Sequence, residues 1–302
     1  SNNLRGDLPA RLGLDYAALG EVNPRIVCAH LSAYGRGNPR ESWPGFDYLM
    51  QAEAGYLSLT GEPDGPPARF GLSIVDMMTG LMSAFGLVSA VLGARATGRG
   101  MDVDTSLFDT ALHNLSYLAT WYLNEGHAQG REERSAHPSL TPSQLYRTRD
   151  GWIFLMCNKE KFWPILANAL GHPEWAEDPR LATFRARLEN RALVTELLDD
   201  ALSADTTEGW MARLGGVLPA APVHSVAEAL DNPFVREHGR VAPFAREDGG
   251  APVEMLTGPV RIDGMDPPTR AAPALGADTD RVLARAGYGS RQIAALREKG
   301  VL

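Results

Sequence analysis

The residue in this sequence best placed to do chemistry is a single carboxylate, Asp76. It follows a short apolar run, 72–75, and precedes a long uncharged segment, 77–94, rich in glycine, alanine and leucine. We interpret these as a buried strand that turns into a buried helix. Asp76 can then be a structural cap, since aspartate is favoured at helix N-termini. It can equally be a partly desolvated nucleophile, with nearby backbone N–H groups stabilising oxyanions.

Other catalytic and metal-binding signatures are missing from the sequence. It has no His-Glu-x-x-His, no closely spaced cysteine pair, no Gly-Lys-Ser/Thr phosphate loop and no Gly-x-Ser-x-Gly elbow. We therefore expect no metal site. The two cysteines, Cys28 and Cys157, fall in apolar runs and are interpreted as buried reduced thiols of a cytoplasmic protein. His30, within an apolar run, is interpreted as a hydrogen-bonded core histidine.

Composition narrows the class of protein. The chain has 302 residues, 44% of them hydrophobic and 22% charged, which is ordinary for a globular protein. Its formal net charge of −8 argues against a general nucleic-acid or anionic-membrane surface. No apolar signal segment is visible at the start. The small residues of 77–94 favour a closely packed core helix over a membrane span, so no membrane partner is expected.

The order of elements predicts an α/β fold with two domains. Residues 25–31 and 101–104 are expected to be strands, and 107–124 a helix whose apolar stripe joins the core. We expect a large parallel-sheet, Rossmann-like domain in 1–140, which ends in the polar linker 127–144. A smaller α+β domain is expected in 141–245, with a return segment and C-terminal helices in 246–302.

Motifs spread over nearly the whole chain resemble the class III coenzyme A transferases, the formyl-CoA and carnitine-CoA transferase family. The segments that carry the resemblance are Asn3-Leu4-Arg5 with Arg11-Leu12-Gly13, Gly45-Phe46-Asp47-Tyr48 with Gln51-Ala52, Ile74-Val75-Asp76 with Thr79-Gly80, Thr97-Gly98-Arg99-Gly100, Val103-Asp104-Thr105-Ser106-Leu107, and Asp178-Pro179-Arg180. Their order along the chain is more specific than any one of them.

The resemblance implies roles for particular residues. Asp76 falls on the family's catalytic aspartate. Contacts to coenzyme A are implied for Asn3, Leu4 and Arg11 and, as an apolar contact, for Leu107. Tyr34 matches a residue near the reacting thioester. Leu4 and Leu107 can also be plain core residues.

The resemblance also implies a reaction. Coenzyme A would move from an acyl-CoA thioester to a carboxylic acid through an aspartyl-CoA thioester on Asp76, with dicarboxylates as the expected acids. No permanently bound cofactor is expected, since coenzyme A is a substrate. The family forms interlocked dimers, so a homodimer is expected.

Departures from the family pattern keep two alternatives open. The chain starts where the family is already inside its large domain, so we expect the N-terminal part of that domain to be absent from it. That expectation motivates a non-catalytic CoA-binding subunit as one alternative. The other is an α-methylacyl-CoA racemase, which needs a second acid or base opposite the aspartate. Related racemases have histidine where this chain has Phe46, although His30 or His113 could substitute.

Overall fold

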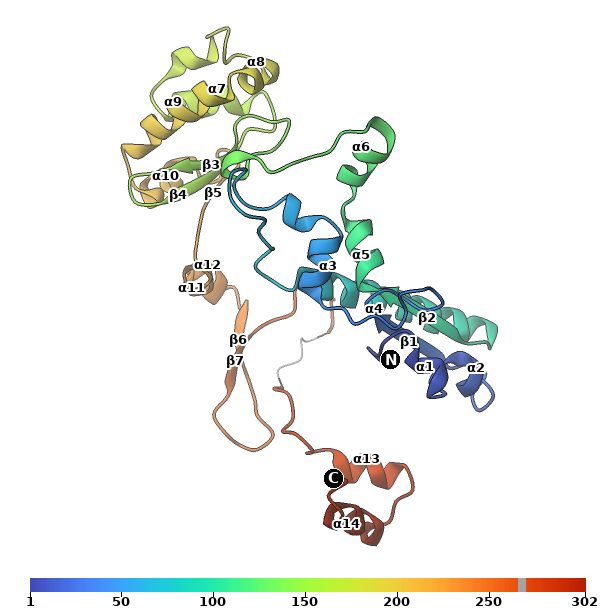
Figure 1. The fold of residues 1–302 in the computed structure, drawn as a ribbon. Helices are drawn as coiled ribbons and strands as arrows, with labels where there is room; N and C mark the ends of the chain where they lie inside the picture. Colours follow the sequence, from blue (N-terminus) through green and yellow to red (C-terminus); the bar gives the residue numbers. More distant parts are fainter. Residues whose placement is uncertain (266–269) are drawn as a thin grey trace. The chain divides into compact units, whose positions relative to one another are not determined.

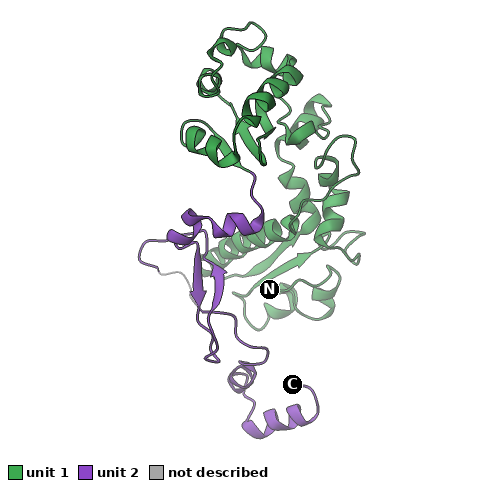
Figure 2. Ribbon diagram, turned by 90° about the vertical axis from the view of Figure 1, so that its left-hand side faces the viewer, with its two compact units in different colours: residues 1–222 green, residues 223–302 purple. Residues whose placement is uncertain are grey.

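The structure is a computed structural model that describes residues 1–265 and 270–302. It divides into two compact units, Ser1–Pro222 and Val223–Leu302, coloured separately in Figure 2. Both helices and strands occur throughout, so the expectation of a mixed α/β fold is confirmed. The predicted domain boundaries near 140 and 245 remain predictions, because compactness alone does not define a folding domain.

A parallel strand pair lies in the first unit. Strand β1 (Val27–Ser32) pairs with β2 (Met101–Ser106) in register from Val27 against Met101 to Ser32 against Ser106. Asn2 pairs in parallel with His30 of β1 through hydrogen bonds that involve Ala29 and Leu31. In the described residues, β1 and β2 are the two strands that pair in parallel. A larger, Rossmann-like parallel sheet is therefore not confirmed.

Three short helices occur in this part of the chain, and the last of them begins the candidate site. Their bounds are α1 (Leu8–Arg11), α2 (Tyr16–Leu19) and α3 (Asp47–Glu53), followed by a 3₁₀ turn at Tyr56–Ser58.

Helix α4 (Ile74–Thr97), labelled in Figure 1, packs on β1, β2 and α3. The packed face carries mostly small side chains. Val75, Thr79 and Ser83 are buried on this face. A side chain at Gly86 would bring its Cβ within 3.1 Å of Val103 on β2, so this helix–strand contact favours glycine. The predicted strand over 72–75 does not form, because α4 already begins at Ile74.

The opposite flank of α4 is open to solvent. Leu81 and Phe85 are 72% and 73% exposed, so the prediction of a wholly buried helix is wrong for the chain as the structure describes it. By length and composition α4 is the one helix in the described residues that could cross a membrane, and 22% of its apolar window is buried. A single helix of this kind is weak support for a span.

The predicted helix over 107–124 is two helices. Helix α5 (Leu107–Asn114) begins at Ser106, whose Oγ accepts a hydrogen bond from the Asp109 N–H. It ends before Ser116, which has a φ of 51°, and α6 (Tyr117–Glu125) follows. A positive φ at a non-glycine residue breaks the helical path, which the apolar periodicity could not reveal.

A second core in the same unit surrounds an antiparallel sheet of order β3-β4-β5. The sheet consists of β3 (Ser143–Arg147), β4 (Trp152–Met156) and β5 (Ala220–Pro222). The helices are α7 (Phe162–Ala169), α8 (Phe184–Glu189), α9 (Arg191–Ser203) and α10 (Thr207–Leu214), with 3₁₀ turns at Glu133–Ser135 and Pro173–Ala176. Tyr146, Trp163 and Leu198 are essentially fully buried there.

The second unit has little buried surface of its own. Its elements are α11 (Val226–Asp231), α12 (Pro233–Glu237), the antiparallel pair β6 (Val241–Phe244) and β7 (Val253–Leu256), α13 (Thr279–Arg285) and α14 (Ser290–Glu298). Phe244 and Ile293 are its buried apolar residues among those described.

Candidate active site

Asp76 lies in the first turn of α4, where the chain enters the helix. The N–H groups of Val75 and Asp76 both donate to Oδ2 of Asp47, at 2.7 and 3.0 Å, and the Met77 N–H donates to the Ser73 carbonyl. These N–H groups are therefore occupied. The N–H groups of Val75, Asp76 and Met77 are thus not free to stabilise an oxyanion, and the expectation that other N–H groups near this turn do so stays a prediction.

Asp47 is itself held by Gln51, one turn later on α3. Gln51 donates from Nε2 to Asp47 Oδ1 at 2.6 Å and to the Leu72 carbonyl at 3.2 Å, and its Oε1 accepts from the Phe70 N–H at 2.9 Å. Asp47 is 3% exposed and Gln51 is fully buried. Sequence reasoning missed both roles. The available signal was the i, i+4 spacing of two polar residues on one short helix.

The electrostatic surroundings of Asp76 keep its carboxyl group more basic than an ordinary aspartate. Partial desolvation raises the pKa of Asp76, and the nearby Asp47 carboxylate raises it further. The residue is nevertheless exposed, and its neighbours Leu72 and Met77 are 56% and 57% exposed. Asp76 thus stands on an open apolar flank and not at the buried bend that the sequence predicted, because the expected strand before it does not form.

Two further predicted residues lie close to this turn. Tyr34 and Leu107 are partly buried against the apolar cluster that contains Val75 and Ala111. The Tyr34 hydroxyl donates to Glu53 at 2.6 Å, and this hydrogen bond, with burial, raises the pKa of Tyr34. The structure therefore brings Tyr34 and Leu107 to the cluster that includes the residue before Asp76.

The three N-terminal predicted residues have a different setting. Asn3 is exposed, Leu4 donates its N–H to the Asn2 side chain at 3.4 Å, and Arg11 pairs with Asp7 at 3.3 Å. No hydrogen bond in the described residues joins them to the turn around Asp76. Their implied role in binding coenzyme A remains a prediction.

A buried polar network lies beside this segment. Asn2 Nδ2 lies 3.0 Å from His30 Nδ1, and His30 Nε2 lies 2.9 Å from Asp102 Oδ1. Since the Asn2 Oδ1 accepts from Leu4, its amide donates to His30, which leaves Nε2–H to donate to Asp102. Arg36 pairs with Asp102 at 3.0 Å. His30 is 2% exposed, as expected for a hydrogen-bonded core histidine.

Replacing Asp102 by alanine should lower the stability of the first unit by about 2 kcal/mol, because the buried His30 ring and the Tyr16 N–H lose their acceptor. Asp104→Ala, on the same strand, should cost less than about 1 kcal/mol, because that carboxylate is 43% exposed. Urea unfolding of both variants measures the difference. Equal losses would contradict the role of the buried network.

The difference in stability between wild type and Asp102→Ala should also depend on pH. Burial pushes the pKa of Asp102 up, but hydrogen bonds from His30, Arg36 and Tyr16 outweigh it, and the pKa lies below its ordinary value. The stabilisation by Asp102 is therefore complete above the unfolded pKa and is lost as the pH falls through the lower folded pKa. The stability gap between wild type and Asp102→Ala should narrow in acid.

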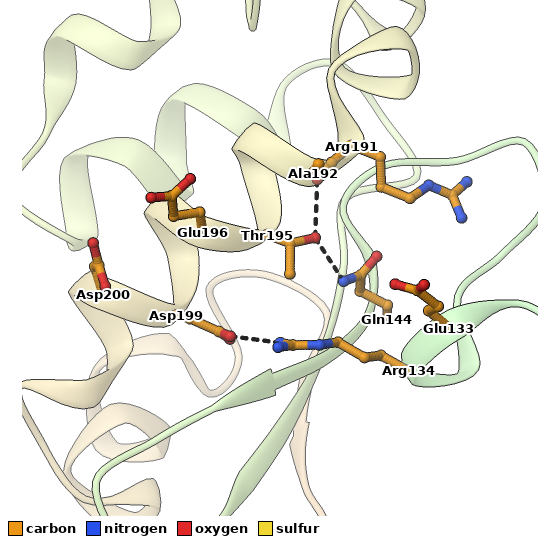
Figure 3. Close-up of a pocket in the computed structure, with 9 residues that line it drawn as sticks. All are labelled: Glu133, Arg134, Gln144, Arg191, Ala192, Thr195, Glu196, Asp199 and Asp200. Carbon is orange, nitrogen blue, oxygen red and sulfur yellow. Dashed lines mark hydrogen bonds and ion pairs between the residues drawn. The ribbon is translucent and has the colours of Figure 1, made fainter. Parts of the chain in front are cut away.

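Two cavities in the first unit lie away from Asp76. One, of about 640 Å³, is polar and lies on α9, where Arg134 pairs with Asp199 and Gln144 donates to Thr195 at 2.9 Å (Figure 3). The other, of about 710 Å³, is mostly apolar and lies between α5 and α6, next to Leu115 and Leu118. Neither is lined by a predicted site residue. Among the described residues no three His, Cys, Asp or Glu side chains are grouped to hold a metal ion.

This α/β chain has an aspartate in the first turn of an apolar helix, with a tyrosine and a leucine packed against the cluster that includes the preceding residue, as the family resemblance predicted. The chain belongs to the CoA-transferase family III, whose model matches residues 1–279. This confirms the resemblance seen in the sequence and makes the protein a member of an enzyme family.

Relatives of this chain include named CoA-transferases. An acyl-CoA transferase of Fusarium pseudograminearum is 32% identical over 303 residues, covering 99% of this chain and 66% of the relative. A succinate–glutarate CoA-transferase of Agrobacterium fabrum is 30% identical over 289 residues, covering 93% of this chain and 70% of the relative. The chain thus spans about two thirds of the length of these relatives.

A solved structure has the same fold. The crystal structure of a CAIB/BAIF family protein from Brucella suis superimposes with a TM-score of 0.81 at 30% identity, over 94% of this chain and 74% of that one. Identity at this level supports a common family as well as a common fold.

Proposed function

We propose that this protein transfers coenzyme A from an acyl-CoA thioester to a carboxylic acid, with Asp76 as the nucleophile. The observation that carries the proposal is the position of Asp76 in a chain of this family. It is a carboxylate in the first turn of α4 with a raised pKa, and no hydrogen bond or ion pair engages it in the described residues. An ionised carboxylate with a raised pKa is a better nucleophile than an ordinary one.

The proposed reaction is two exchanges at one carboxylate. An Asp76 oxygen attacks the thioester carbonyl, the C–S bond breaks, and an aspartyl–acyl anhydride and CoA thiolate form. The thiolate attacks the aspartyl carbonyl, which releases the donor acid and leaves an aspartyl-CoA thioester. The acceptor carboxylate attacks this thioester and expels CoA thiolate. Attack of that thiolate on the acceptor carbonyl of the second anhydride gives the new acyl-CoA and restores Asp76.

The proposal also covers the acid substrates, the residues that contact coenzyme A and the oligomeric state. The Agrobacterium fabrum relative is named for succinate and glutarate, which supports dicarboxylates as the acids. Asn3, Leu4 and Arg11 would contact coenzyme A, which acts as a substrate and not as a permanently bound cofactor. The exposed apolar flank of α4 supports a homodimer, or more polypeptide of the same protein, as its cover. We propose a cytoplasmic enzyme that binds neither nucleic acid nor membranes.

Incubation of the intact protein with succinyl-CoA, without an acceptor, tests the proposal. Mass spectrometry should find one CoA thioester per chain on the peptide that contains Asp76, and hydroxylamine should remove it. Addition of glutarate should discharge the label as glutaryl-CoA. A protein that exchanges CoA without ever carrying this label would contradict the aspartyl intermediate.

The geometry argues against His30 as the second acid or base that a racemase would need. His30 is buried, and both of its ring nitrogens are hydrogen-bonded to Asn2 and Asp102. It therefore cannot move a proton at a substrate carbon without breaking that network. Phe46 occupies the position where the related racemases have histidine.

A further inference from the structure

The N-terminus of α4 is capped by a residue from a different helix. Ser73, in the cap position, makes no side-chain hydrogen bond to the helix. Asp47 takes over this function from α3, with Oδ2 accepting from the N–H groups of Val75 and Asp76. Ordinary capping uses a local side chain and needs no buried carboxylate from elsewhere.

Burying the Asp47 carboxylate costs free energy, and capping the N-terminus of α4 does not by itself require a buried carboxylate. Its carboxylate is 3% exposed, and no ion pair among the described residues includes it. It is held by three N–H donors, two from the backbone and one from Gln51. Burying a carboxylate costs free energy even when it is hydrogen-bonded, whereas the neutral Ser73 in the cap position could have served the helix alone.

The contacts explain what Asp47 does for its neighbour. A carboxylate in the first turn of a helix normally turns back onto the free N–H groups of that turn, which stabilises the anion and lowers its reactivity. Here two of those N–H groups are already taken by Asp47. The Asp76 carboxylate accepts no hydrogen bond in the described part of the chain, and the negative charge of Asp47 disfavours its ionised form further.

We infer that Asp47, held by Gln51, is the positioning residue for the Asp76 nucleophile: it binds the N–H groups of Val75 and Asp76 and so fixes the backbone that carries the nucleophilic carboxylate. The inference rests on the proposed function of Asp76. Asp47 itself does not touch substrate. It fixes the backbone of Val75 and Asp76 and keeps the nucleophile free and basic.

The effect of Asp47 on Asp76 can be tested separately from the effects of the other titratable side chains near α4. Asp47 is the charged side chain whose effect on the Asp76 pKa is resolved. The other titratable side chains on the elements packed against α4 are Tyr48 and Glu53 on α3, Cys28 and His30 on β1, Asp102 and Asp104 on β2, and Asp109 and His113 on α5.

The test compares Asp47→Asn with the double variant Asp47→Asn, Gln51→Glu in the intact protein. In the single variant an amide faces the Gln51 amide, and we expect labelling of Asp76 by succinyl-CoA to slow by on the order of 10²-fold. In the double variant the introduced asparagine can accept from both backbone N–H groups and donate to the introduced glutamate. The swapped pair should recover most of the lost rate.

Two readouts separate positioning from a merely structural role. With the Asp47 charge removed, the acid limb of the labelling-rate profile should move to lower pH, because Asp76 then ionises more easily. Hydrogen exchange of the 70–78 segment should be faster in the single variant and restored in the double variant. Asp109→Asn, which removes an exposed carboxylate of α5, should change neither readout.

The outcomes distinguish this inference from the function it rests on. If wild-type protein is never labelled at Asp76, the proposed function fails. If the wild type is labelled and Asp47→Asn is labelled equally fast, with the same acid limb, the positioning role is overturned and the function stands. Loss of labelling without rescue or a moved acid limb would likewise overturn the positioning role.

Discussion

Replacing Asp76 by alanine should abolish CoA transfer and leave the protein folded. The nucleophile is lost, and no nearby carboxylate can take its place, because both oxygens of Asp47 are engaged in a buried site. We expect the rate of exchange between succinyl-CoA and glutarate to fall by on the order of 10³-fold or more. The Asp76 side chain makes no contact that the helix needs, so the melting temperature should stay close to that of the wild type.

The matched control is Asp64→Ala, in the exposed loop that precedes α4. It removes the same side chain from the neighbouring loop and should leave both exchange and labelling unchanged. Exchange is followed by chromatography of the acyl-CoA products, and labelling by intact mass. An Asp76→Ala protein that exchanges CoA at the original rate would exclude an aspartyl-CoA route.

Replacing Arg187 by methionine should destabilise the core around β3, β4 and β5 by roughly 3 kcal/mol. Arg187 is fully buried and donates to the carbonyls of Thr141 and Leu181, at 3.0 and 2.8 Å, and to Glu160 at 2.6 Å. Its guanidinium also lies 5.2 Å from the centre of the Trp163 ring. Methionine fills part of the volume but leaves the two carbonyls without these donors.

A neighbouring arginine on the same helix isolates the effect of burial. Arg185 is 88% exposed and pairs with Glu189, one turn away. Arg185→Met should change stability by less than about 0.5 kcal/mol. Thermal unfolding followed by tryptophan fluorescence reports on this core, which contains Trp163, Trp175 and Trp210. Similar melting temperatures for the two variants would show that the buried hydrogen bonds of Arg187 contribute little.

Periodicity and capping signals predicted most of the regular elements. The predicted strands 25–31 and 101–104 appear as β1 and β2, and the C-terminal helices expected within 246–302 appear as α13 and α14, because each has a local signal in its own residues. The break between α5 and α6 was missed, since a positive φ at Ser116 has no signature in apolar spacing. The expected strand at 72–75 does not form, because α4 already begins at Ile74.

Part of the candidate site could likewise be predicted from local signals in the sequence. The position of Asp76 next to an apolar helix is visible in the sequence, and the family confirms the class of protein. Its solvent exposure and its dependence on Asp47 were not visible. The two residues are 29 positions apart, and their hydrogen bond depends on how α3 packs on α4, which no local pattern encodes. Asn3, Leu4, Arg11, Tyr34 and Leu107 keep their roles as predictions.

The uncovered side of α4 has a consequence for any measurement on this chain in solution. Apolar side chains such as Leu81 and Phe85 stand in water there, at a free-energy penalty that any binding surface relieves. Whatever covers them binds the folded form and so stabilises it by mass action. With the proposed homodimer, a second copy of this chain is that cover, and the melting temperature should therefore rise with protein concentration.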